Sequence, residues 1–135
     1  MRIEALDHLV LTVADLDRTV GFYCGVLGME EVVFGGGRRA LRFGSQKINL
    51  HQAGAEFSPA ARKPVPGSGD LCFLVASLDE AMRRLTEAKV AIEEGPVSRT
   101  GAMSPLRSVY VRDPDGNLVE LSEPQAVVLA GGAEA

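Results

Sequence analysis

The 135-residue sequence has the length of one compact domain, and its apolar content of 46% is enough for one packed core. Its formal net charge of −4, without a long run of Lys or Arg, argues against nucleic acid or an acidic membrane surface as the main partner. No signal-peptide pattern opens the chain and no apolar run approaches a transmembrane length, so we expect a soluble cytoplasmic protein. Cys24 and Cys72 are too few for a disulfide framework, and we expect free thiols.

The first half of the chain predicts a strand, a helix and three further strands. Apolar residues alternate over residues 8–13, as in a strand with two different faces. Apolar residues then recur at helical spacing from Leu16 to Leu27, and Gly28 follows where a left-handed cap would end the helix. The three further strands are predicted at Glu30–Phe34, Arg39–Phe43 and Lys47–Gln52.

The second half repeats this plan. Residues 69–79 echo residues 7–17 at a distance of 62 positions, which indicates a duplicated module. Ser77 and Glu80 are predicted to form a capping box at the start of the second helix. Its strands are predicted at Ala91–Glu93, Arg107–Arg112 and Leu118–Ser122, the last two joined by the turn sequence Asp113–Asn117.

These elements predict an α+β fold with one domain over residues 1–125. The domain consists of modules 1–54 and 67–125, connected through the Pro-, Ala- and Gly-rich segment Ala53–Ser68. Residues 126–135 are small and non-periodic, and we expect a flexible tail there.

Three segments together resemble the vicinal oxygen chelate superfamily, namely Leu6–Val13, Phe22–Met29 and Asp113–Glu120. This superfamily includes glyoxalase I, type I extradiol dioxygenases, fosfomycin-resistance proteins and bleomycin-binding proteins. Gln46–Gln52 and Glu93–Ala102 look more narrowly like a glyoxalase-domain branch that includes virulence-associated proteins. The resemblance implies paired βαβββ modules that curve around a cavity. It also implies a divalent metal ion held by residues of the first and last strands of the modules.

The family's ligand positions fall on His8, Asn49, Asp70 and Glu120, and of these His8 and Glu120 match the usual residues. Strand alternation places all four opposite the apolar faces of their strands. His51 shares the face of Asn49, and with His8 and Glu120 it would complete a two-His-one-carboxylate set. With Asp70 instead, the site would be richer in oxygen and would suit Mn²⁺, Mg²⁺ or Fe²⁺ better than Zn²⁺. The ion (Mn, Fe, Zn, Ni or Mg) stays open.

Each candidate also has a purely structural interpretation. His8 and Glu120 could bond to each other without a metal. Asp70 could accept backbone hydrogen bonds from the turn at residues 66–69, and His51 could cap a strand end or bind substrate. Glu120 is hardest to explain in this way, because an inward carboxylate between apolar neighbours is costly to bury unless it is paired or metal-bound.

A second group of side chains is expected around the mouth of the cavity. By alternation Tyr110 shares a face with Ser108 and Arg112, so it is predicted to reach the site. Guanidinium groups there could clamp a carboxylate or phosphate, whereas arginines paired with surface acids are the alternative. The predicted substrate-binding residues are Arg42 and Asn49, Arg99 in a loop, and Arg107 and Arg112.

These features predict a metal-dependent lyase or isomerase that acts on a small anionic oxygenated molecule, with Glu120 and Tyr110 as catalytic residues. Three alternatives stay open: an extradiol-type dioxygenase, a metal-free small-molecule binding protein of the bleomycin-resistance type, and an interaction module whose sheet edges pair in a dimer and whose cavity is vestigial. We also expect a homodimer. The sequence leaves open whether the cavity lies within one chain or between two.

Overall fold

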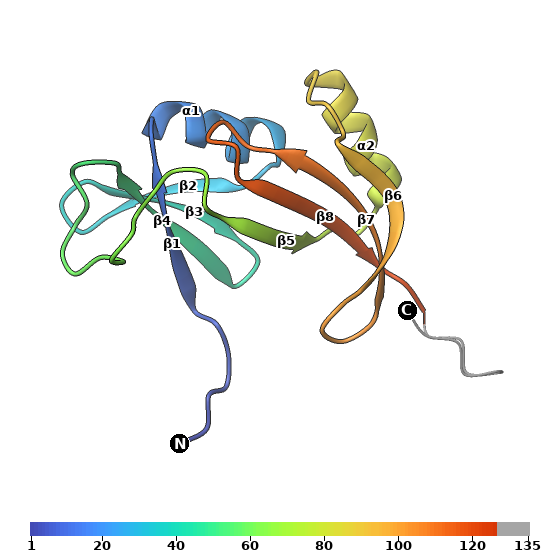
Figure 1. Cartoon of the computed structure of the whole chain (residues 1–135), viewed down its shortest axis with the longest axis horizontal. Helices are drawn as coiled ribbons and strands as arrows, with labels where there is room; N and C mark the ends of the chain where they lie inside the picture. Colours follow the sequence, from blue (N-terminus) through green and yellow to red (C-terminus); the bar gives the residue numbers. More distant parts are fainter. Residues whose placement is uncertain (127–135) are drawn as a thin grey trace. The chain divides into compact units, whose positions relative to one another are not determined.

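The computed structural model describes residues 1–126 of the chain, which divide into two compact units (Figure 1). The first unit comprises Met1–Gly69 together with the short segment Pro114–Gly116, and the second comprises Asp70–Asp113 and the residues from Asn117 onward. The tail predicted at 126–135 lies, beyond Ala126, outside the described residues. None of the helices found in residues 1–126 has the length and apolar character needed to span a membrane.

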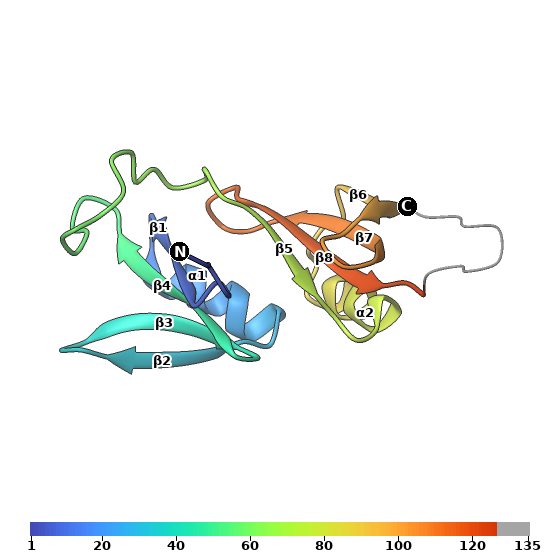
Figure 2. The same cartoon turned by 90° about the horizontal axis from the view of Figure 1, so that it is seen from below.

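The first unit has the element order βαβββ. Its sheet has the strand order β1-β4-β3-β2, with β1 parallel to β4 and the other pairs antiparallel (Figure 2). The three further strands predicted in this half are confirmed, with boundaries shifted by no more than one residue. The elements are β1 (His8–Val13), α1 (Leu16–Val20), η1 (Gly21–Val26), β2 (Glu30–Phe34), β3 (Arg38–Phe43) and β4 (Gln46–Gln52).

The predicted first helix is present, but its second half is wound more widely than an α-helix. The α-helical part ends at Val20 and continues as the π-helix η1, in which the Leu27 N–H donates to the Phe22 carbonyl oxygen at 3.1 Å. Gly28 has a φ of +79°, which confirms the left-handed cap predicted there. Phe22 and Tyr23 are buried on this segment, so the helix anchors to the core near its C-terminal end.

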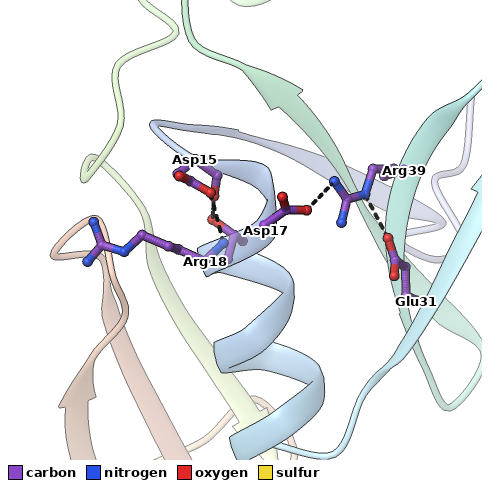
Figure 3. Close-up of polar contacts among 6 residues, drawn as sticks. Asp15, Asp17, Arg18, Glu31 and Arg39 are labelled. Carbon is purple, nitrogen blue, oxygen red and sulfur yellow. Dashed lines mark hydrogen bonds and ion pairs between the residues drawn. The ribbon is translucent and has the colours of Figure 1, made fainter.

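One face of the first sheet is covered by the helix of the same unit. Apolar side chains of β1, β3 and β4 are buried there: Leu11, Val13, Leu41, Ile48 and Leu50. Arg39 lies on this face as well, because it pairs with Leu50 across β3 and β4. Its guanidinium bonds to Asp17 of α1 at 2.9 Å and to Glu31 of β2 at 2.6 Å, which connects the helix to the sheet (Figure 3).

The second unit repeats the order βαβββ, which confirms the predicted α+β fold of paired modules. Its sheet has the order β5-β8-β7-β6, again with the first and last strands of the unit parallel. Buried Leu78 and Leu85 of its helix pack over the apolar side chains of β7 and β8. The elements are β5 (Asp70–Leu74), α2 (Leu78–Glu87), β6 (Glu94–Thr100), β7 (Pro105–Arg112) and β8 (Leu118–Pro124).

The start of α2 shows half of the predicted capping box. The Ser77 hydroxyl accepts a hydrogen bond from the Glu80 N–H at 3.1 Å, as predicted. A second free N–H of the helix, that of Leu78, donates instead to the Glu123 carboxylate at 2.8 Å. This bond joins the helix terminus to β8, so the cap also fixes the helix on its sheet.

The strand predicted at Ala91–Glu93 is wrong, and with it the placement of Arg99 in a loop. The strand β6 starts at Glu94 and runs to Thr100, so Arg99 is a strand residue. A register shift between Glu94 and Val97, on either side of Gly95, interrupts the side-chain alternation on which the prediction depended. Glu93 still joins the ladder through a 2.7 Å hydrogen bond from its N–H to the Tyr110 carbonyl oxygen.

Gly95 provides a test of this irregular strand. Its φ is +108°, and a Cβ there would overlap the Ser108 carbonyl oxygen and lie 3.0 Å from the Val109 Cα. We therefore expect Gly95→Ala to lower the free energy of unfolding by about 2–4 kcal/mol. Denaturant unfolding of Gly21→Ala is the control, because Gly21 has helical angles and free space around it. Equal stability of the two variants would contradict the assigned geometry.

Candidate functional site

In each unit the sheet face opposite the helix, called here the uncovered face, collects polar side chains. In the first unit β1 and β4 pair His8 with Lys47 and Thr12 with His51. Side chains on paired residues share a face, and residues two apart along a strand do so too. His8, Lys47, Asn49 and His51 therefore all lie on the uncovered face of the first unit.

Asn49 and His51 are buried, and both carry side-chain polar atoms without hydrogen-bond partners among the described residues. Their exposed fractions are 6% and 3%, and within residues 1–126 nothing bonds to the Asn49 Oδ1 or to either ring nitrogen of His51. Phe57, from the segment after β4, packs edge-on against the imidazole with ring centroids 5.5 Å apart. Burial of unpaired polar atoms costs about 1–3 kcal/mol for each group. These two side chains are thus buried polar groups of this face whose hydrogen-bonding capacity the described residues do not satisfy.

The surroundings of the His51 imidazole favour its neutral form, because they lower its pKa. Burial is the main cause that lowers its pKa, and the nearby positive charge of Arg38 lowers it further. The Glu56 carboxylate acts in the opposite direction but more weakly. A neutral imidazole has one N–H donor and one nitrogen lone pair, so His51 can donate to a ligand or bind a cation.

His8 is exposed and held by its neighbour in the sequence. Its Nδ1 lies 2.8 Å from the Asp7 Oδ2. An ionised carboxylate only accepts hydrogen bonds, so Nδ1 carries the proton and Nε2 keeps its lone pair in the neutral ring. Carboxylate-bound histidines of this kind are common among metal ligands, because the carboxylate orients the ring.

Two cations of the uncovered face were not among the residues predicted from the sequence. The Lys47 Nζ lies 3.8 Å from the ring centroid of Phe34, and the Arg38 Cζ lies 5.4 Å from the same centroid. The Arg38 guanidinium also lies 4.4 Å from the ring centroid of Phe57. Within residues 1–126 neither cation forms an ion pair, whereas the predicted Arg42 is paired with Glu30.

On the second unit, Glu120 belongs to a hydrogen-bonded row on the uncovered face. The Ser122 hydroxyl is 3.2 Å from the Glu120 Oε2 and 2.7 Å from the buried Ser108 hydroxyl. The Cys72 thiol lies 3.2 Å from the same Ser122 oxygen, and burial raises its pKa. Since Cys72 pairs directly with Glu120 across β5 and β8, these four side chains form one network. The Glu120 carboxylate is therefore held by its neighbours within the sheet.

Tyr110 pairs with Glu120 across β7 and β8, so it shares the uncovered face as predicted. Its hydroxyl oxygen accepts a hydrogen bond from the Arg99 Nε at 2.8 Å. Arg99 also bonds to Glu94 at 2.9 Å, and these two partners raise the pKa of the guanidinium. The phenol keeps its own O–H proton for donation to another group.

The remaining predicted residues of the second unit are spread over both faces. Arg112 bonds to Glu93 at 3.0 Å, and Asp70 lies exposed at the start of β5. Arg107 lies on the helix-covered face, where its guanidinium is 3.3 Å from the Asp79 carboxylate of α2. Arg107 is therefore on the opposite face of β7 from Tyr110.

The predicted metal ligands are divided between the two units. His8, Asn49 and His51 lie on the first unit, and Asp70 and Glu120 lie on the second. Across residues 1–126 there is no group of three His, Cys, Asp or Glu side chains arranged as a metal site. Each unit by itself thus brings together only part of the predicted set.

The side chains that sequence reasoning missed are Arg38, Lys47 and Phe34. The alternation used for Asn49 and His51 already placed Lys47 on the same face. Arg38 was missed because the strand was predicted to begin one residue later, at Arg39. The ion pairs that engage the other arginines depend on cross-strand register, which the sequence did not provide.

Comparison with known proteins identifies the class to which this chain belongs. The family model described as the Glyoxalase/Bleomycin resistance protein/Dioxygenase superfamily matches residues 5–121. The chain is a member of this superfamily, as its resemblance in the sequence implied. Members commonly bind a divalent metal ion.

Several relatives cover nearly the whole chain. A glyoxalase domain-containing protein, RDO1, of Mycosarcoma maydis is 56% identical over 93% of this chain and 71% of its own length. The virulence protein STM3117 of Salmonella typhimurium is 51% identical over 91% of this chain and 86% of its own length. The crystal structure of STM3117 superposes with a TM-score of 0.91, covering 93% of this chain and 100% of that one. A lactoylglutathione lyase structure from Agrobacterium tumefaciens gives a TM-score of 0.70 at 28% identity, covering 90% and 95%.

The lowered pKa of His51 predicts a loss of stability in acid. On acidification the unfolded chain binds a proton at this residue near its ordinary pKa, before the folded chain does. The stability that neutral His51 contributes is complete above the ordinary pKa and falls as the pH falls toward the lowered value. In EDTA, His51→Gln should therefore lose less unfolding free energy between pH 7 and pH 5 than the wild type. The measurement is the free energy of unfolding from denaturant melts at each pH. If it changes with pH equally in the wild type and in His51→Gln, the burial of this imidazole is contradicted.

Proposed function

We propose that the chain is a metal-dependent enzyme of the lyase or isomerase type that acts on a small, anionic, oxygenated molecule. The observation that carries the proposal is the buried His51 imidazole, which has no hydrogen-bond partner among the described residues and lies on the same face as Asn49 and His8. A buried group that nothing in the fold satisfies is typical of a binding site.

The residues present fit a divalent ion of the kind common in this superfamily. We assign His8, through Nε2, His51 and Glu120 as the ligand set, with Asp70 as a further oxygen donor. Two imidazoles and one carboxylate leave open positions for substrate on a divalent ion. The hydrogen bonds from His8 to Asp7 and from Ser122 to Glu120 are the outer contacts that orient metal ligands in proteins.

A divalent ion bound by these residues would supply Lewis-acid polarisation of substrate oxygens. Glu120 accepts a proton from the substrate, and the Ser122 hydroxyl bonded to its Oε2 holds the carboxylate in position. Tyr110 faces Glu120 from β7 and donates its phenol proton to a substrate oxygen, while Arg99 holds the phenol oxygen in place. Acid and base thus come from neighbouring positions of one sheet.

The lyase or isomerase type rests partly on a relative. The lactoylglutathione lyase from Agrobacterium tumefaciens has the same fold at 28% identity. Proton transfer next to polarised oxygens is the chemistry that a carboxylate, a phenol and a divalent ion support together. An extradiol-type dioxygenase would require Fe²⁺, so the identity of the functional ion separates the two reactions.

Metal analysis tests the proposal directly. Protein purified without a His tag and loaded with Mn²⁺, Fe²⁺, Zn²⁺, Ni²⁺ or Mg²⁺ should bind about one ion per chain. His8→Ala and Glu120→Gln should each weaken the affinity for that ion at least about tenfold, because each removes a ligand. Glu87→Gln removes an exposed carboxylate of α2 and should leave the affinity unchanged.

Two results would contradict the proposal. If no ion binds above the background of the Glu87→Gln control, the metal-free binding protein becomes the better interpretation. If an ion binds but His8→Ala and Glu120→Gln retain the wild-type affinity, the ligand set is wrong.

We further propose that the chain forms a homodimer. A mixing experiment tells whether the residues that bind one metal ion come from one chain or from two. With ligands shared between two copies, mixed His8→Ala and Glu120→Gln proteins should regain about a quarter of the wild-type metal sites after subunit exchange. With all ligands from one chain, the mixture should regain none. Gel filtration of the mixture provides the control. If metal binding is regained while the sample stays monomeric, neither shared ligands in a dimer nor ligands from a single chain explain the result.

A further inference from the structure

We propose that Arg38 and Lys47 form an oxyanion-binding subsite on the uncovered face of the first unit. The subsite takes the carboxylate, phosphate or phosphonate group of a small ligand whose remaining part is apolar. It deepens the proposed function, because it names the part of the substrate that the first unit binds.

The distribution of ion pairs sets these two residues apart. Within residues 1–126, every other Lys or Arg residue of the strands is bonded to a carboxylate. Arg38 and Lys47 have none, although the chain carries an excess of acidic residues and a formal net charge of −4. The residues with carboxylate partners are Arg39, Arg42, Arg99, Arg107 and Arg112.

The two unpaired charges are held close to each other. Both lie within 5.4 Å of the centroid of the Phe34 ring, and Arg38 packs against Phe57 as well. Cation–π contacts stabilise each cation by about 0.5–1 kcal/mol at exposed sites and limit its movement. A ligand oxyanion that contacts both cations would form two attractive charge pairs.

Three carboxylates of the first unit have partners other than these two cations. Glu30 is bonded to Arg42, and the Glu56 carboxylate accepts a hydrogen bond from the Gly54 N–H at 2.7 Å. Asp7 is bonded to His8. In the described part of the chain, no carboxylate is paired with either cation.

Buried polar groups on the same face point to a ligand independently of the charges. Asn49 and His51 alternate with Lys47 along β4, and both are more than nine-tenths buried with polar atoms that bond to no described residue. Planar guanidinium and compact ammonium donors match oxyanions, and the Phe34 and Phe57 rings suit an apolar group attached to the anion. Charge, donors and apolar surface thus describe one kind of ligand.

Calorimetric titration of the full chain in EDTA tests the subsite with phenylphosphonate, benzoate and neutral benzyl alcohol as probes. At least one of the two anions should bind, and benzyl alcohol should not. The anion with the lower Kd shows whether the subsite prefers a phosphonate or a carboxylate. Arg38→Gln and Lys47→Gln should each raise its Kd about tenfold, a loss of one charge-assisted contact. Arg18→Gln removes an α1 charge of the same sign and should change Kd less than twofold.

Amide NMR shifts of the wild-type chain provide a readout that does not depend on the folding of a variant. Addition of the bound anion should move resonances of β3 and β4. Binding of no anion, equal losses in Arg38→Gln and Arg18→Gln, or shifts confined to the second unit would each overturn the subsite. EDTA removes divalent ions, so anion binding is measured independently of the proposed metal site. If the chain binds the anion but has no affinity for a metal ion, only the metal proposal is contradicted.

Discussion

The structure depends on one constraint: each four-stranded sheet has a helix on only one of its faces. Strand alternation then assigns every second side chain to the helix-covered core and the rest to the uncovered face. Leu11, Ile48 and Leu50 fill the core of the first unit, and their neighbours Asn49 and His51 turn the other way. The same rule places Val119 and Leu121 beneath α2 and sends Glu120 to the opposite face. The polar groups of both repeats thus follow from how the apolar ones pack.

Electrostatics distinguishes structural charges from available ones. Arg39 and Arg107 hold a helix on its sheet through carboxylates of α1 and α2, and Arg99 positions the Tyr110 hydroxyl. These guanidinium groups are bonded within the protein, so they have fewer N–H donors left for a ligand. Arg38 and Lys47 differ because aromatic rings hold them in place of carboxylates. The uncovered face of the first unit thereby combines positive charge with buried polar atoms, neither of which is paired by the residues from 1 to 126.

Much of the fold could be predicted because the repeat, the apolar alternation and the caps are local signals. Gly28 and Ser77 have the predicted capping roles, and the strand faces follow from single-residue alternation. The strand at Glu94–Thr100 was mislocated because Gly95 and the register shift break that period. At the site, the faces of His8, Asn49 and His51 could be predicted. The partners of the arginines could not, because ion pairs depend on cross-strand register and rotamers.

The central proposal is that His8, His51 and Glu120 are ligands of a divalent ion. Paramagnetic line broadening by substoichiometric Mn²⁺ in amide NMR spectra measures this most directly. The account predicts selective loss of signals at and next to these three residues, with Asp79 and Glu80 of α2 unaffected. Broadening that centres on the exposed acids of α2, or on only one of the two units, would contradict it.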